Sequence, residues 1–153
     1  MHITRTKEID YIVECVMASW DQTCDDGSVP RDLYFPDVSD NVVWLKVEDF
    51  GVFAFTKMNH ILFEVHTILL PSAHGKSVDI AKAVVQWMWD NTCARRIITS
   101  VPEFNQLALR LAERVGFIRY GVNVKSFQKN GYLFDQTMLG INKENESCQL
   151  QQQ

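Results

Sequence analysis

The sequence is poor in the residues that build metal sites and cross-linked frameworks. It has four cysteines and four histidines in 153 residues, and the cysteines form no CxxC pair (Cys15, Cys24, Cys93 and Cys148). Thiols and imidazoles scattered in this way do not have the spacing of a zinc site or of a disulfide framework. We therefore expect no bound metal, and free thiols in a reducing compartment.

Long apolar runs and an excess of positive charge are also absent. No run approaches the roughly 20 apolar residues that a membrane span needs, and there is no leader of basic and then apolar residues. The 15 basic and 19 acidic side chains give a net charge of -4, which offers no footprint for duplex DNA or an anionic lipid surface. We expect a soluble, cytoplasmic protein with no nucleic-acid partner and no membrane partner.

The apolar content is sufficient for a single core. Hydrophobic residues make up 46% of the chain, and a chain of this length suits one domain. Residues 1–5 suggest a short strand, and the 3.6-residue spacing from Ile9 to Trp20 predicts a helix capped by Thr6. Two runs, 42–47 and 52–57, then form a hairpin pattern.

The region from Asp21 to Asp40 is irregular in composition and predicts a loop or a short second helix. Its acidic side chains are those of a solvated loop, which is the favoured interpretation, or they attract a cationic substrate. They are Asp25, Asp26, Asp32 and Asp37.

The centre of the chain is a strand that leads into a helix. The apolar run from Ile61 to Leu70 ends at Pro71 and passes through a short bend into an apolar helical stretch that begins after Gly75. Such a junction directs unpaired backbone N–H groups and the positive end of a helix dipole at one point. It is therefore a plausible seat for a phosphate-bearing ligand.

A second strand followed by a helix comes next in the sequence. A strand at 96–101 ends at Pro102, and a helix from Phe104 to Val115 stops at Gly116. A strand, helix, strand and helix with short connections imply a crossover and locally parallel pairing. Asn130 and Gly131 then predict a hairpin between 118–128 and 132–139. Residues 142–153 are polar, which predicts a disordered tail after a single domain of residues 1–141.

This order of elements resembles the GNAT superfamily of acetyl-CoA-dependent N-acetyltransferases. The helix segment FNQLALRLAERVGF (104–117) and the ending SFQKNGYLFDQTMLGI (126–141) carry the resemblance. The pair EVHTILLP (64–71) and TSVPEFN (99–105) is similar to GNAT-like proteins encoded by tailed bacteriophages. The family implies an α/β (α+β) fold with a mixed, mostly antiparallel sheet of six or seven strands, helices on both faces and a splay at the central strands.

The sequence also departs from the family pattern. His74 stands where the cofactor loop usually has a basic residue, and Ser77 and Asp79 stand where small residues are usual. Gly75 keeps the backbone freedom of the loop, and Ser77 is a good N-cap residue. The carboxylate of Asp79 competes with a phosphate for the helix dipole, an effect that Lys76 offsets. Ala112 occupies the position of the family's tyrosine general acid.

The resemblance also implies the site residues. Acetyl transfer needs a base because an amine is mostly protonated at neutral pH. Glu64 is the first candidate and His66 the second, since they share a face of the central strand; the alternatives are a structural ion pair and a core histidine. The cofactor, acetyl-CoA, would contact the backbone of Thr67, Ile68, Leu69 and Leu70 and the amides of His74, Gly75, Lys76, Ser77 and Val78. Asn105 would contact the cofactor or cap the helix in which it lies.

The acceptor would be an unidentified primary amine, either a small molecule or a protein N-terminus or lysine. The letters GKS at 75–77 do not make a nucleotide-binding loop, because the earlier glycine of that motif is absent. A rival hypothesis is a non-catalytic accessory protein on the same fold, such as a phage factor for virion assembly or DNA transfer with a degenerate cofactor site. Tyr34 or Phe35 could form the surface of a homodimer.

Overall fold

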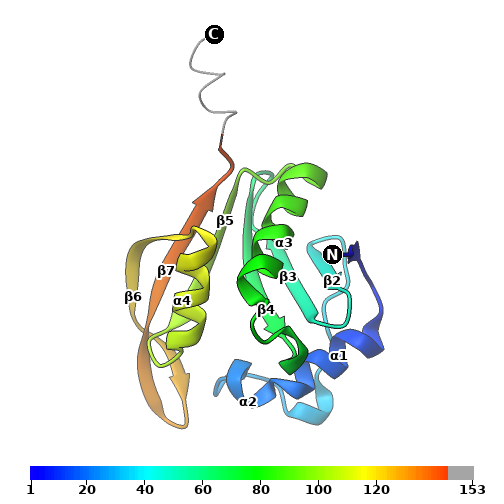
Figure 1. Ribbon diagram of the computed structural model, residues 1–153. Coiled ribbons are helices and arrows are strands. Elements are labelled where there is room, and N and C mark those ends of the chain that lie inside the picture. Colours follow the sequence, from blue (N-terminus) through cyan, green and yellow to red (C-terminus); the bar gives the residue numbers. More distant parts are fainter. Residues whose placement is uncertain (145–153) are drawn as a thin grey trace.

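The β-rich runs of the sequence form one seven-stranded sheet in a computed structural model that describes residues 1–144 (Figure 1). The strand order is β1-β2-β3-β4-β5-β7-β6. Only the β4–β5 pair is parallel, and the other pairs are antiparallel. The strands are β1 (Ile3–Arg5), β2 (Val42–Val47), β3 (Gly51–Lys57), β4 (Leu62–Leu69), β5 (Arg96–Pro102), β6 (Ile118–Lys129) and β7 (Tyr132–Asn142).

Helices cover both faces of the sheet, and each face has its own core. One core lies between the sheet and the pair α3 and α4, and it contains Phe55, Ile80 and Ile97. The other lies between the sheet and α1 and contains Ile12, Trp44 and Ile68. The helices are α1 (Ile9–Ala18), α2 (Trp20–Thr23), α3 (Ser77–Asn91) and α4 (Gln106–Val115), with short 3-10 turns at Arg31–Leu33 and Pro71–Ala73. None of the helices in residues 1–144 is long and apolar enough to cross a membrane.

The turns follow the signals in the sequence. Asn130 and Gly131 have φ angles of 54° and 79° and join β6 to β7, as a tight hairpin turn requires. Gly116 has a φ of 116° and ends α4, with its N–H bonded to the carbonyls of Ala112 and Glu113. The predicted hairpins and the α4 stop are therefore confirmed.

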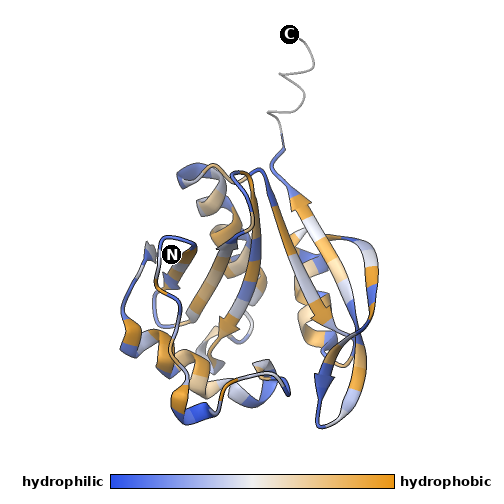
Figure 2. Cartoon of the chain, turned by 180° about the vertical axis from the view of Figure 1, so that it is seen from behind, coloured by the Kyte–Doolittle hydropathy of each residue, from blue (hydrophilic) through white to orange (hydrophobic). Residues whose placement is uncertain are grey.

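The sheet divides into two halves that are joined at one end. β4 and β5 pair through only three residue pairs, the last of which is Glu64 with Ile98. Beyond that pair, β4 pairs with β3 alone and β5 with β7 alone. The two strands diverge along the rest of their length (Figure 2). The fold class is thus the one expected, including the splay between the central strands.

Two helix starts differ from their expected form. Thr6 is not the N-cap of α1: Glu8 occupies that position without a side-chain cap, and the Thr6 hydroxyl accepts a bond from the Glu8 N–H at 3.0 Å. Ser77 is not the N-cap of α3: it is the first helical residue, and Lys76 occupies the cap position. In both cases the chain enters the helix one or two residues away from the best capping residue, because the preceding strand or bend sets its direction.

The C-terminal boundary also lies slightly later than expected. β7 extends to Asn142, and the N–H of Lys143 bonds to the carbonyl of Arg95 at 2.8 Å. The ordered sheet therefore includes the start of the segment 142–153. The rest of the predicted tail, 145–153, lies outside the described residues.

Candidate functional site

A cavity of about 800 Å³ occupies the place where β4 and β5 diverge. It runs from the α3–α4 face of the sheet to the α1–α2 face, since residues from both faces line it. Its walls include Val65–Ile68 of β4, Thr99–Pro102 of β5, Ala81, Val84 and Val85 of α3, and Ala108, Leu111 and Ala112 of α4. A molecule in the cavity would therefore touch both halves of the sheet.

The edge of β4 that faces the cavity has unpaired backbone groups. Antiparallel strands bond through alternate residues, and the Leu70 N–H bonds to the Phe50 carbonyl at 2.8 Å. Because Ile68 pairs opposite Val52 in the same alternation, Ile68 and Leu70 direct their backbone groups at β3. Thr67 and Leu69 direct theirs at the gap. Of the four residues expected to pair with a cofactor, the backbones of these two face the gap.

Val65 marks where the open edge begins. Its carbonyl faces β5 and accepts a bond from the Thr99 hydroxyl at 3.2 Å. Thr99 was not a candidate site residue, because a threonine in a strand is usual and carries no motif. Its hydroxyl replaces a backbone donor at the fork and allows β5 to leave β4 without an unsatisfied carbonyl there.

The bend between β4 and α3 presents free amides. The N–H groups of His74 and Lys76 bond to the carbonyls of Pro71 and Ala73, at 3.0 and 2.9 Å. Among residues 1–144, no acceptor is found for the N–H groups of Gly75, Ser77, Val78 and Asp79. Of the five amides expected to contact a cofactor, those of Gly75, Ser77 and Val78 thus have no acceptor within residues 1–144, and those of His74 and Lys76 are bonded.

The Asp79 carboxylate does not bond to the free N–H groups at the start of α3. Its side chain is exposed and makes no capping bond to the first turn of α3. Lys76 lies over the Phe50 ring, with its Nζ 4.9 Å from the ring centroid. The bend therefore contains a basic residue as well as the unbonded amides. The bend lies outside the walls of the 800 Å³ cavity, so a ligand that used both would have to be longer than the cavity itself.

His66 and Glu64 form a pair on the α1 face of β4. Their Nε2 and Oε1 atoms are 3.2 Å apart, and 64% of the His66 side chain is exposed against 30% of the Glu64 side chain. His66 lies in the wall of the cavity, and Glu64 does not. The structure therefore places His66, the second base candidate, at the cavity. Glu64, the first candidate, contacts His66 but does not line the cavity.

The hydrogen bond between the two side chains affects the pKa of Glu64. The hydrogen bond from His66 is the main cause that lowers the pKa of Glu64 below its ordinary value, while partial burial opposes the shift. Glu64 is then ionised at neutral pH and can only accept a hydrogen bond. The Nε2 of His66 therefore donates to it in this contact, and in the tautomer with its proton on Nε2 the lone pair is on Nδ1.

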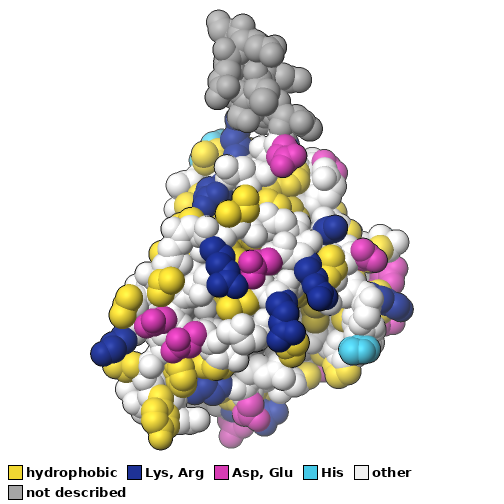
Figure 3. Space-filling model, turned by 60° about the vertical axis from the view of Figure 1, so that its left-hand side comes forward, with side chains coloured by type: hydrophobic (Ala, Val, Ile, Leu, Met, Phe, Trp, Pro, Cys, Tyr) yellow, Lys and Arg dark blue, Asp and Glu magenta, His cyan; other side chains and the backbone are white. Residues whose placement is uncertain are grey.

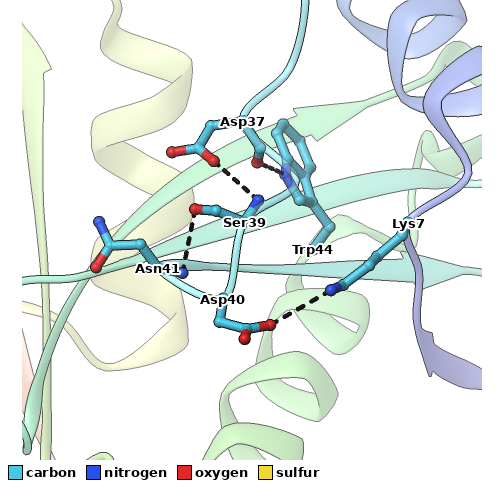
Figure 4. Close-up of polar contacts among 6 residues, drawn as sticks. All are labelled: Lys7, Asp37, Ser39, Asp40, Asn41 and Trp44. Atoms are coloured by element: carbon cyan, nitrogen blue, oxygen red, sulfur yellow. Dashed lines mark hydrogen bonds and ion pairs between the residues drawn. The ribbon is translucent and has the colours of Figure 1, made fainter.

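The α1 side of the cavity has aromatic walls. Trp44, Ala54 and His66 are register partners and lie side by side across β2, β3 and β4. The Trp44 Nε1 donates to the Asp37 carbonyl at 2.7 Å, which holds the indole in place (Figure 4). Trp20 and Tyr34 pack edge to face, with ring centroids 5.7 Å apart. Tyr34 is half-buried and lines the cavity, whereas Phe35 is 67% exposed. A homodimer surface at these residues stays a prediction.

Two of the loop carboxylates also reach this side of the cavity. Asp25 accepts bonds from the Gly27 N–H at 2.9 Å and from the Ser28 hydroxyl at 3.3 Å, and Asp37 accepts from the Ser39 N–H at 2.9 Å. The side-chain and backbone bonds from Ser39 lower the pKa of Asp37. Asp25 and Asp37 line the cavity, but Asp26 and Asp32 do not.

Asn105 caps α4 and also lines the cavity. Its Oδ1 accepts from the Ala108 N–H at 3.2 Å, so it is the N-cap of α4. It also lies in the cavity wall, and its Nδ2 makes no hydrogen bond within residues 1–144. Ala112 lines the cavity as well and brings no acidic group to it.

Comparison with protein families gives one match. Residues 25–152 match a family described as a protein of unknown function, DUF2824. The chain belongs to this family. The description of DUF2824 assigns no activity. No curated protein matches the chain.

Solved structures show what fold this DUF2824 member has. A point mutant of the spermidine N-acetyltransferase SpeG from Vibrio cholerae matches 93% of this chain and 95% of its own, with a TM-score of 0.75 and 16% identity. A ribosomal-protein-S5-alanine acetyltransferase from Vibrio fischeri matches 94% of this chain and 93% of its own, with a TM-score of 0.75 and 14% identity.

A third structure is the microcin C7 self-immunity acetyltransferase MccE, solved with acetyl-CoA and AMP. It matches 67% of this chain and 60% of its own, with a TM-score of 0.57 and 21% identity. The chain therefore has the fold of the GNAT acetyltransferases. At these identities the likeness establishes the fold and not the reaction.

Proposed function

We propose that the protein is an N-acetyltransferase that binds acetyl-CoA between β4 and β5 and passes the acetyl group directly to a primary amine. The observation that carries this proposal is the open edge of β4 beside a cavity that connects the two faces of the sheet. The cavity would allow a thioester to enter from the α3–α4 face and an amine from the α1 face. The solved acetyltransferases with the same fold support the proposal.

The residues present fit acetyl-CoA, which would supply the activated acetyl group. The backbone groups of Thr67 and Leu69 would bond to the amides of its pantetheine arm, in place of the missing strand partner. The free N–H groups of Gly75, Ser77 and Val78, with Lys76 nearby, suit its diphosphate. Asn105 could donate from its Nδ2 at the cavity wall.

His66 is the base that this geometry supports. Its Nδ1 is free to accept a proton from the attacking amine, while Glu64 holds the opposite ring nitrogen. Glu64 itself is a weaker base because its pKa is lowered. We therefore assign proton transfer to His66 and ring orientation to Glu64. The unpaired N–H groups of the β4 edge can stabilise negative charge that develops on the thioester oxygen.

The acceptor side favours an amine with an apolar body. Trp20, Tyr34 and Trp44 supply aromatic surface there, with the carboxylates of Asp25 and Asp37 nearby. Aromatic faces and carboxylates both attract an ammonium group. A small amine and the N-terminus or lysine of a protein both have this chemistry.

The rival function is a non-catalytic accessory protein, including a phage assembly or DNA-transfer factor. Two observations favour it: Ala112 brings no acid to the cavity, and the free amides of the bend lie outside the cavity walls. Such a protein would not bind acetyl-CoA. Cofactor binding therefore separates the two functions.

Calorimetric titration with acetyl-CoA tests the proposal, with thermal unfolding as a second measurement. We expect micromolar binding and a higher melting temperature at millimolar cofactor, since a ligand at about 1,000 times its dissociation constant stabilises the fold by about 4 kcal/mol. Ala112→Trp should fill the cavity and abolish binding. Leu107→Trp, on the exposed face of the same helix, should leave binding intact. Absence of binding by the unmodified protein would reject the enzyme.

A further inference from the structure

A carboxylate joins the two halves of the molecule at the end where the sheet is open. Asp26 accepts a hydrogen bond from the Asn130 N–H on Oδ1 at 2.8 Å and from the Gly131 N–H on Oδ2 at 2.9 Å. Its own N–H donates to the Gln128 carbonyl at 2.9 Å. The loop after α2 is thus fastened to the tip of the β6–β7 hairpin, far along the chain. We call these three hydrogen bonds the Asp26 clasp.

A further contact supports the clasp. The Lys129 Nζ donates to the carbonyl of Asp21, a residue of α2 just before the loop. The turn conformation of Asn130 and Gly131, with positive φ at both residues, presents two successive N–H groups to one carboxylate. Hydrogen bonds to an ionised group are stronger than neutral ones. Both α2 and the start of the loop that follows it therefore contact the hairpin.

The clasp borders the cavity on both sides. On the loop, Cys24, Asp25 and Ser28 flank Asp26 and line the cavity. On the hairpin, Ser126 and Phe127 line it as well. The β4–β5 pairs close one end of the divergence between the sheet halves, and the clasp connects the halves at the hairpin tip. The position of this outer wall therefore depends on Asp26, although Asp26 itself does not line the cavity.

We propose that Asp26 is a positioning residue for the acceptor, because it holds α2 and the start of the following loop, Trp20 to Ser28, as the outer wall of the acceptor side. This role rests on the proposed acetyl transfer. Apart from Asn105, the proposed cofactor contacts lie on β4 and the α3 bend, which share no hydrogen bond with the clasp. Loss of the clasp should therefore weaken productive binding of the amine and leave the affinity for acetyl-CoA unchanged.

Hydrogen exchange and kinetics of Asp26→Ala and Asp26→Asn test the proposal. In Asp26→Ala, the Asn130 and Gly131 amides should exchange faster, and the KM for a probe amine with an apolar body, phenethylamine, should rise by about fivefold with kcat nearly unchanged. The affinity for acetyl-CoA should stay within about twofold. Asp26→Asn keeps one oxygen acceptor and should fall between Asp26→Ala and the unmodified protein. The matched control is Asp32→Asn, an exposed carboxylate in the same region that does not line the cavity.

Each outcome decides one claim. If the Asn130 and Gly131 amides of the unmodified protein exchange as fast as free amides, the clasp does not form. If exchange rises in Asp26→Ala while the KM stays constant, Asp26 has no positioning role. If acetyl-CoA does not bind, the acetyl-transfer proposal fails, and with it the positioning role, while the exchange data still test the clasp. If Asp26→Ala does not fold, Asp26→Asn provides the same comparisons.

Discussion

At the scale of single residues, the His66–Glu64 pair explains why a glutamate lies inside an apolar strand. Glu64 is only partly exposed, and an acidic group there needs a partner. His66 supplies that partner at 3.2 Å and lowers the pKa of Glu64. Glu64 and His66, the two candidates for the general base, are thus hydrogen-bonded to each other.

This arrangement predicts the effects of two substitutions. His66→Asn should lower kcat by roughly a hundredfold, a typical contribution of a general base. Glu64→Gln should lower it less, because its amide oxygen can still accept from Nε2. Steady-state assays under saturating acetyl-CoA would measure both effects. The control is His60→Gln, which lies two residues before the start of β4. If His66→Asn is as active as this control, His66 has no role in catalysis.

The lowered pKa of Glu64 also predicts a pH dependence of stability. A carboxyl group whose pKa is lower in the folded state stabilises that state above its unfolded pKa, and this contribution disappears as the pH falls through the folded pKa. The difference in free energy of unfolding between the unmodified protein and Glu64→Gln should therefore be largest near neutral pH and vanish in acid. Urea unfolding between about pH 3 and pH 7 would show it. A difference that grows in acid would contradict the assignment.

At the scale of elements, the start of α4 serves structure and site together. The Asn105 side chain caps the helix and lies in the cavity wall. Asn105→Ala should cost about 1 kcal/mol of stability through the lost cap. Asn105→Ser keeps a capping oxygen and loses the Nδ2 donor.

The two Asn105 variants therefore separate the roles. Thermal unfolding should show a deficit for Asn105→Ala alone, whereas calorimetry should show weaker acetyl-CoA binding for both variants. Normal binding by Asn105→Ser would leave Asn105 as a helix cap only.

The edge strand β6 has a different character from the open edge of β4. Ile118, Val122 and Val124 are between 56% and 73% exposed on it, and Figure 3 shows hydrophobic side chains among charged ones on this side of the molecule. Register shifts between Arg119 and Gly121 and between Asn123 and Phe127 interrupt the strand. Such bulges hinder pairing of an edge with another chain. The open edge of β4, by contrast, faces the cavity between the two halves of the sheet.

At the scale of the whole molecule, the two halves of the sheet form the cavity by diverging. This geometry predicts a pattern of amide exchange along β4. The Thr67 and Leu69 amides face the gap and should exchange quickly in the free protein, then slowly with acetyl-CoA. The Ile68 and Leu70 amides are bonded to β3 and the turn before it, and should be protected in both states. Residue-resolved hydrogen exchange would measure this, and equal protection of all four amides would contradict the open edge.

Local signals in the sequence were enough for most elements. Asn130–Gly131, Gly116 and the apolar run before Pro71 each determine structure through contacts a few residues away. The same local reasoning identified Glu64 and His66, because alternation along a strand places them on one face. It wrongly predicted Thr6 and Ser77 as N-caps, because the cap position depends on how the preceding segment enters the helix.

The sequence by itself determined the order of the elements, the two hairpins and a strand–bend–helix junction, because these depend on backbone preferences and short-range periodicity. Only the tertiary structure decided which base candidate lines the cavity, which amides are free and that Asp26 joins the loop to the hairpin. Those features depend on contacts between residues far apart in the chain. A carboxylate in an irregular loop has the same local pattern whether it meets water or the tip of a distant hairpin.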